Sequence, residues 1–314
     1  MGDDYGGCAG VGGDPRVYHM CISDRGPVVK VAVGGYLMEV MGPKFQSNED
    51  FGGLRGVIRD FTAGSRRRLQ RKLASINEFE VGLPDFVTLT YPAEYSWDWR
   101  DWKRHLHNFI KALVRAWPRV WGVWRLEFQE RGAPHFHFLL WDGPQVDGIE
   151  VWYETRKKIV VIPDASSKHN IDVFMWMSET WYRVVRSGDP KHLAAGTRIE
   201  PIQTWNGVRY YSSKYLAKLP SGKFVPSEYD GTGRFWGVIG KKRWKVTFLE
   251  ETVPETVFFK IKRVIRKRLE RKGIDIGRMK RRINQDMGVT TFIDSKTALM
   301  LLTWAWDEVG YVPF

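Results

Sequence analysis

Cysteine is scarce in this chain, and its scarcity excludes several classes of protein. Only Cys8 and Cys21 are present among 314 residues, so neither a disulfide framework nor a zinc site built on cysteines is available. We therefore expect the chain to work in a reducing compartment. No His-Glu-x-x-His sequence occurs either, which argues against a metalloprotease of that type.

Long apolar runs and nucleotide-binding loops are also absent. No stretch approaches the ~18–20 apolar residues of a transmembrane helix, so we expect no membrane span. The first seven residues have neither a basic start nor an apolar segment, and they do not resemble a secretion signal. Because no Gly-x-x-x-x-Gly-Lys-[Ser/Thr] loop is found, we expect no fused helicase domain.

Positive charge, in contrast, is abundant. The chain carries 49 Lys and Arg against 36 Asp and Glu, a formal net charge of +13. Such a surface attracts polyanions, and nucleic acid is the leading candidate. Fifteen Trp and an aromatic fraction of 14% add groups that can stack on unpaired bases, although most aromatic side chains are expected in the core.

Composition divides the chain into three regions. Residues 1–60 are predicted to be an N-terminal extension, disordered over the Gly- and Asp-rich residues 1–15, with one or two strands over 28–40. Residues 61–220 hold the motifs that suggest chemistry. Residues 221–314 are predicted to be a basic C-terminal region that contacts DNA, including an amphipathic helix over 254–272 with one strongly basic face.

A basic helix is predicted to begin at Ser65 as its N-cap, because Leu69, Leu73 and Ile76 recur at helical spacing. Five cations without an acidic neighbour cover its remaining surface. They are either a solvated helix face or contacts to DNA phosphates, and we predict the latter for Arg66, Arg67, Arg68, Arg71 and Lys72.

The order of elements after this helix predicts an α+β fold. Residues 86–91 alternate as a strand, 97–117 repeat apolar residues at helical spacing, and 119–142 read as a β-hairpin. A possible second hairpin over 144–168, a helix over 170–186 and an edge strand over 197–203 follow. We expect an antiparallel sheet flanked by helices.

The 119–142 hairpin carries the first candidate site. Because side chains alternate along a strand, His135 and His137 share one face, and Glu127 lies on the matching face of the preceding strand. Two histidines and a carboxylate on an open sheet face can bind a divalent metal and leave positions for a substrate. The alternative is a pair of half-buried histidines without a ligand. Arg131 in the turn is predicted to contact DNA.

A helix over 207–220 carries the second candidate site. At about 100° per residue, Tyr211, Lys214, Tyr215 and Lys218 fall on one face, whereas Tyr210 points elsewhere. A phenol beside lysines and a metal-polarised phosphate can attack a phosphodiester and form a phosphotyrosine. The alternative is an amphipathic helix with its tyrosine hydroxyls in water.

In combination these motifs resemble the HUH endonucleases, and among them the two-tyrosine initiators of rolling-circle replication. The resemblance rests on Phe86-Val-Thr-Leu-Thr-Tyr91, His135-Phe136-His137 and the tyrosine helix, in that order. The chain is similar in this respect to the gene A proteins of small single-stranded-DNA phages and to related plasmid initiators.

The resemblance implies a five-stranded HUH nuclease fold that nicks single-stranded or cruciform origin DNA with Mg²⁺ or Mn²⁺. By this resemblance His135, His137 and Glu127 hold the metal, with Gln129 as a substitute for Glu127. One tyrosine makes the nick and leaves a 5′-phosphotyrosine, the other closes the circle, and Lys214 and Lys218 stabilise the phosphate or phenolate.

The same resemblance implies a host polymerase and helicase as partners, in the cytoplasm of a bacterial cell. Two alternatives stay open from the sequence. One is a transposase or relaxase with the same site, and the other is a nucleic-acid-binding protein without catalysis.

Overall fold

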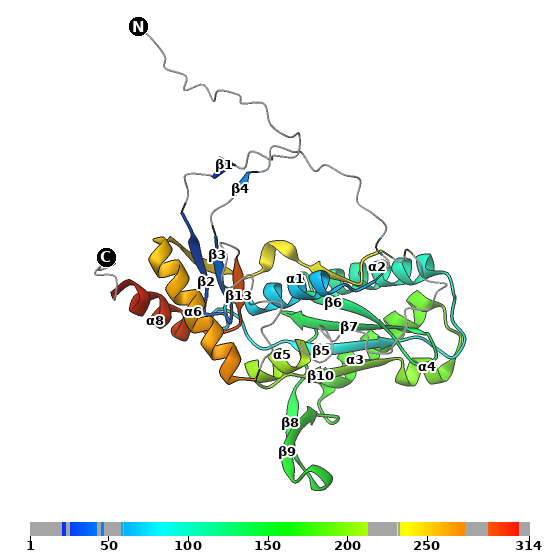
Figure 1. Ribbon diagram of the computed structural model, residues 1–314. Helices are drawn as coiled ribbons and strands as arrows, with labels where there is room; N and C mark the ends of the chain where they lie inside the picture. Colours follow the sequence, from blue (N-terminus) through cyan, green and yellow to red (C-terminus); the bar gives the residue numbers. More distant parts are fainter. Residues whose placement is uncertain are drawn as a thin grey trace, which may run out of the picture.

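The computed structural model describes residues 21–22, 26–42, 45–46, 58, 60–212, 231, 233–273 and 288–307. Within these ranges the chain forms two sheet-and-helix units, each built around its own cluster of buried apolar side chains (Figure 1). No helix in the described part of the chain combines the length and the apolar character needed to cross a membrane.

A five-stranded antiparallel sheet forms the larger unit and confirms the predicted α+β fold. Its strands lie in the order β10 (Thr197–Pro201), β5 (Asp85–Thr90), β7 (Pro134–Trp141), β6 (Trp121–Phe128) and β11 (Trp236–Ile239). The predicted hairpin is β6–β7, and its histidine strand lies at the centre of the sheet. The strand predicted over 197–203 lies at one edge of the sheet. Proline has no backbone N–H to donate to a neighbouring strand, and Pro201 is therefore tolerated in this edge strand.

One face of this sheet is apolar and packs on two long helices, α2 (Trp99–Ala116) and α3 (Lys168–Val185). The ring of Phe109 on α2 lies 5.9 Å from that of Phe138, and Trp181 on α3 lies 6.2 Å from Phe136. Strand alternation places Phe136 and Phe138 here and therefore turns His135 and His137 to the opposite face.

Two shorter helices, α1 (Ala63–Ala74) and α5 (Trp205–Tyr211), contact the histidine face. The prediction that α1 begins at Ser65 was wrong, because Thr62 is its N-cap and accepts a hydrogen bond from the Ser65 amide. The Ser65 hydroxyl instead accepts a 2.9 Å hydrogen bond from Nε1 of Trp236 on β11. A cap side chain must precede the helical turn that it satisfies, and Thr62 is the hydroxyl in that position.

A second hairpin follows β7, as the sequence suggested for residues 144–168. It consists of β8 (Gly148–Tyr153) and β9 (Lys158–Pro163), joined through a short 3₁₀ turn at Glu154–Arg156, and it projects from the body of the molecule in Figure 1. The small helix α4 (Pro190–Ala195) leads from α3 back to the sheet edge at β10.

The second unit joins segments from both ends of the chain. The strands lie in the order β12 (Thr247–Thr252), β2 (Val28–Val33), β3 (Met38–Met41) and β13 (Val289–Thr291), and they pack against α6 (Glu255–Arg271) and α8 (Ser295–Asp307). In Figure 1 the blue strands of the N-terminal segment lie beside the orange and red helices. The sequence-based division had assigned these segments to separate regions, whereas here they share one core. A two-stranded pair, β1 (Cys21–Ile22) with β4 (Phe45–Gln46), precedes and follows β2–β3.

The β2–β3 turn links the two units. Gly34 there has φ +66°, and a Cβ atom would lie 1.9 Å from Oδ1 of Asn77, so the turn requires glycine. The Tyr36 amide donates to the carbonyl of Ala74 at the end of α1, 2.7 Å away. On the next strand, the buried Glu39 forms a 2.5 Å ion pair with Arg71 of α1.

Candidate active site

A row of aligned side chains crosses the sheet on the histidine face. The register sets His137 opposite both Thr88 of β5 and Arg125 of β6, and the row continues to Arg198 on β10 and Trp236 on β11. Residues paired directly across an antiparallel sheet point to the same side. The exposed Arg198 marks the solvent end of this row, and His137 and Arg125 are buried within it.

The next row toward the β6–β7 turn holds His135 between Thr90 and Glu127. His135 and Glu127 are half-buried, so this end of the face is the more accessible one. The two imidazole rings lie with their centroids 4.4 Å apart. The structure thus brings together the three side chains that were predicted as metal ligands.

Each histidine is oriented by a threonine of β5. The Thr88 hydroxyl lies 3.2 Å from Nδ1 of His137, and the Thr90 hydroxyl lies 3.3 Å from Nε2 of His135. With Nδ1 of His137 on Thr88, its Nε2 faces the carboxylate of Glu127 at 3.5 Å. Hydrogen bonds of this kind fix the ring orientation of metal-binding histidines.

The His137–Glu127 pair has suitable geometry for two ligands of one cation. Ligand distances near 2.0–2.2 Å, found for small divalent cations, place neighbouring donors about 3 Å apart, close to the observed 3.5 Å. No group of three His, Cys, Asp or Glu side chains converges on a single point among the described residues. His135 would complete the set if its ring turned from Thr90, since it stands in the adjacent row.

Arg125 places a buried positive charge at the base of this cluster. Its Nε lies 3.6 Å from the Glu127 carboxylate, and its guanidinium carbon lies 3.5 Å from the centroid of the Phe61 ring. Burial lowers the pKa of Arg125 to about 10, with the charges of Glu127 and Asp60 opposing the shift, so the side chain stays charged at neutral pH. The Glu127 carboxylate therefore lies beside a buried positive charge.

The tyrosine helix is described as far as Tyr211 in α5 and Ser212. The predicted site residues Lys214, Tyr215 and Lys218 lie outside the described residues. The half-buried Tyr211 ring packs 4.5 Å from Phe86, which in turn stacks on His137 at 5.3 Å. Tyr210 is 54% exposed, in agreement with its predicted direction away from Tyr211.

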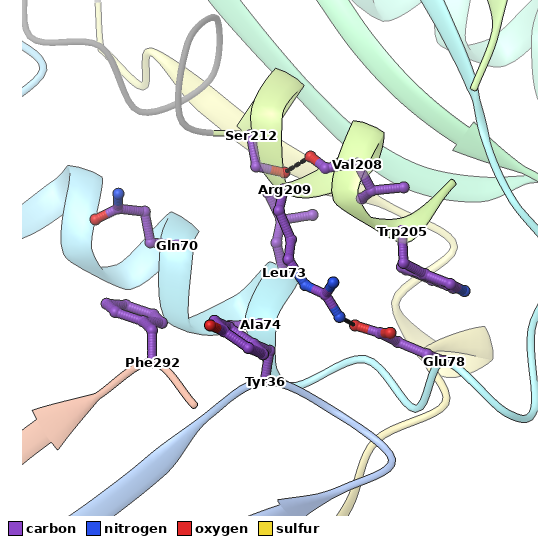
Figure 2. A pocket seen from close by; sticks show the side chains of 10 residues that line it. All are labelled: Tyr36, Gln70, Leu73, Ala74, Glu78, Trp205, Val208, Arg209, Ser212 and Phe292. Carbon is purple, nitrogen blue, oxygen red and sulfur yellow. Dashed lines mark hydrogen bonds and ion pairs between the residues drawn. The ribbon is translucent and has the colours of Figure 1, made fainter. Parts of the chain in front are cut away.

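A small cavity of about 160 Å³ lies between α1, α5 and the β2–β3 turn (Figure 2). Its lining includes residues of α1 and α5 together with Tyr36 and Phe292 of the second unit. Across it the Arg209 guanidinium forms an ion pair with Glu78 and lies 4.6 Å from the Tyr36 ring centroid. Both units therefore anchor the start of the tyrosine helix.

These features can be compared with known protein families. Residues 84–219 match the family model described as Replication-associated protein ORF2/G2P. This segment is similar to that family. The match runs from β5 through the histidine hairpin to the tyrosine helix, nearly the same span as the resemblance found from the motifs, and it is consistent with a rolling-circle replication initiator. Neither the curated proteins nor the solved structures gave a match.

The cations of α1, which precede the segment that matches the family model, occupy different environments. Arg67 and Arg68 are exposed, and Arg66 is half-buried near the start of the helix. Arg71 pairs with Glu39, and the ammonium of Lys72 lies 4.4 Å from the Trp244 ring centroid. Burial, and secondarily Lys241, lowers the pKa of Lys72. Arg67 and Arg68 are therefore the best placed of the five for phosphate contact.

Arg131 has a structural role that sequence reasoning missed. Its guanidinium donates to the carbonyls of Tyr91, Pro92 and Ala93, and Nε donates to Oε1 of Gln129 at 3.0 Å. It thereby ties the histidine hairpin to the loop that follows β5. Gln129, the predicted substitute ligand, is engaged by this arginine, and DNA contact by Arg131 stays a prediction.

Thr88, Thr90 and Arg125 were not identified from the sequence as site residues. A signal was available for the threonines, because residues 86–91 alternate hydroxyl and apolar side chains and the hydroxyls had to face one side. Only the register between β5 and β7 shows that this side is the one with the histidines.

Proposed function

We propose that this protein initiates rolling-circle replication by nicking single-stranded origin DNA through attack of a tyrosine, and later rejoins the strand. The observation that carries the proposal is the cluster of His135, His137 and Glu127 on the same sheet face that Tyr211 contacts through Phe86. The family of residues 84–219 supports a role in replication.

In the proposed reaction the phenol oxygen of Tyr211 or Tyr215 bonds to phosphorus and loses its proton. The bond from phosphorus to the 3′ oxygen breaks, and that oxygen takes up a proton to become the 3′-OH that a host polymerase extends. The 5′-phosphotyrosine conserves the energy of the phosphodiester, so attack by a new 3′-OH can reverse the step and close a circle.

The site residues would divide this work. A bound Mg²⁺ or Mn²⁺ would polarise the scissile phosphate. His135, His137 and Glu127 would hold the ion, Thr88 and Thr90 would orient the imidazoles, and Arg125 would place a positive charge beside the Glu127 carboxylate. Lys214 and Lys218 would neutralise the phosphate or lower the pKa of a phenol that ordinarily titrates near 10.

A denaturing gel shift tests the proposal. The protein and its Tyr211→Phe, Tyr215→Phe and double variants are incubated with labelled single-stranded DNA from the protein's own replicon, with Mn²⁺ or with EDTA. We expect a Mn²⁺-dependent covalent band that one single substitution reduces and the double substitution abolishes. Tyr210→Phe is the matched control, since Tyr210 is adjacent but exposed on another side of the helix.

The products distinguish the alternatives. A closed circular product identifies an initiator rather than a transposase, which transfers its strand to a different site. If the DNA binds but no origin fragment gives an adduct, the protein is a non-catalytic nucleic-acid-binding protein and the proposal is wrong.

A further inference from the structure

The β8–β9 hairpin exposes large apolar side chains that the proposed reaction does not use. Trp152 and Ile159 are directly paired on one face near its tip, and their side chains are 53% and 58% exposed. Tyr153, on the other face, is 45% exposed. Apolar side chains gathered on a projecting arm mark a binding surface rather than part of a core.

The turn of this hairpin is basic. Arg156, Lys157 and Lys158 follow one another there, against the acidic Glu150 and Glu154 in the same hairpin. The indole N–H of Trp152 donates to Glu154 at 2.9 Å, which fixes the ring beside the turn. Aromatic surface next to cations is the combination that stacks on bases while neutralising phosphates.

The arm also stands at the edge where the histidine row ends. Strand β9 lies against β10, and Gly148 lies beside Pro201 at the end of β10. Arg198 on β10, 72% exposed in its side chain, continues the row that contains Thr88 and His137. A six-residue strand spans about 20 Å, comparable with the width of a DNA duplex. A DNA strand that crosses the histidine face of the sheet would leave it next to this arm.

We infer that the β8–β9 hairpin binds DNA at the junction between duplex and single strand. Trp152 stacks on the last base pair and Ile159 packs against it, the exposed Lys157 of the turn contacts the phosphates, and the arm keeps the two DNA strands apart while one of them lies on the sheet. Wedges of apolar side chains unstack base steps in this way in other DNA-binding proteins. The inference rests on the proposed function, because it assumes that origin DNA lies on the histidine face.

Binding of the full-length protein to forked DNA tests the inference without cleavage. The fork carries 2-aminopurine at the junction and the buffer contains EDTA, so no nick can form. We expect a rise in 2-aminopurine fluorescence with the unmodified protein. Trp152→Ala should weaken binding to the fork about 5- to 150-fold, the loss expected for one stacked base, and abolish the rise in fluorescence.

Three comparisons make the result specific. Trp152→Phe keeps an aromatic face and should restore most of the affinity. Phe79→Ala removes an 87% exposed aromatic side chain outside the arm and should leave fork binding unchanged. Affinity for a fully single-stranded origin oligonucleotide, and any covalent adduct formed on it with Mn²⁺, should not change in Trp152→Ala.

Each failure points to a different error. If Trp152→Ala binds the fork as the unmodified protein does, the inference is wrong even when the adduct forms. A change in oligomeric state of Trp152→Ala, seen by light scattering without loss of fork binding, would make the arm a protein–protein surface instead. If no adduct forms on any oligonucleotide while fork binding depends on Trp152, the proposed nicking reaction fails and the DNA-binding arm stands.

Discussion

The carboxylate of Glu127 lies 3.5 Å from Nε2 of His137, although the register of β6 and β7 sets Glu127 opposite His135. The side chain leans toward the buried histidine, where Arg125 also contacts it at 3.6 Å. This contact makes His137 and Glu127 the innermost pair of the proposed metal site and His135 its solvent-side member.

The proposed metal binding by this cluster can be measured independently of catalysis. We expect His137→Ala and Glu127→Gln each to weaken Mn²⁺ binding at least 10-fold in isothermal titration calorimetry or electron paramagnetic resonance, because each removes a ligand. Glu130→Gln removes an exposed carboxylate from the adjacent turn and serves as the control. Equal Mn²⁺ affinity in all three variants would place the metal elsewhere.

Thr88 should act on the metal through His137. Thr88→Val keeps the side-chain shape but removes the hydroxyl 3.2 Å from Nδ1, and we expect Mn²⁺ affinity and nicking to fall about 10- to 100-fold. Thr88→Ser restores the hydroxyl and should recover most of both. A failure of serine to rescue would show that the methyl group, and therefore packing, is what matters at this position.

The exposed cations of α1 are expected to contact phosphates. Replacing Arg67 and Arg68 with Gln should weaken binding to single-stranded DNA and reduce the slope of log affinity against log salt by about 0.7 for each phosphate that the variant no longer neutralises. Arg100→Gln removes one exposed arginine at the start of α2 and is the comparison for Arg67→Gln and Arg68→Gln made singly. An unchanged slope in the α1 variants would mean that this helix face is merely solvated.

Local patterns predicted most elements of the larger unit. The apolar repeat of α2, the alternation in β5 and the β6–β7 hairpin are properties of short segments, and each formed near its predicted position. The alternation of side chains along the two strands was enough to place His135, His137 and Glu127 on one face of the sheet.

Relationships between distant segments could not be predicted in the same way. Nothing in residues 28–41 indicates that they pair with β12 and β13, more than 200 residues later. Hydrophobic periodicity indicates which face of a strand is buried, but it does not identify the segment that packs against that face. Lys262 shows the same limit. A lysine in the helix predicted over 254–272 is expected on its basic face, but Lys262 is 1% exposed, with its ammonium 4.4 Å from the Phe258 ring centroid.

The ion pair between Arg71 and Glu39 should stabilise the junction of the two units. Arg71→Met leaves the Glu39 carboxylate, 8% exposed, without this partner, and we expect a loss of about 1–3 kcal/mol in the free energy of unfolding. Arg100→Met breaks an exposed pair with Asp98 and should cost less than about 1 kcal/mol. Urea unfolding followed by tryptophan fluorescence compares them. Equal losses would mean that the buried carboxylate finds another partner.

Asp85, at the start of β5, should make stability depend on pH. Burial raises the pKa of its carboxyl to about 7, against a smaller opposing effect of the Val146 amide that donates to it. Because the folded protein then holds a proton that the unfolded chain releases near pH 4, stability is greatest at the acidic end of this range. It falls as the pH rises from about 4 to 7, by at most about 1.4 kcal/mol per pH unit.

Asp85→Asn should remove this dependence, because an amide does not titrate. Urea midpoints measured between pH 4.5 and 7.5 should decline for the unmodified protein and for the control Asp172→Asn, an exposed residue of α3, and should decline less for Asp85→Asn. If the decline is equally steep in all three proteins, the carboxyl of Asp85 is already ionised in the folded state. Water or a cation must then reach β5 at the end of the sheet opposite the histidines.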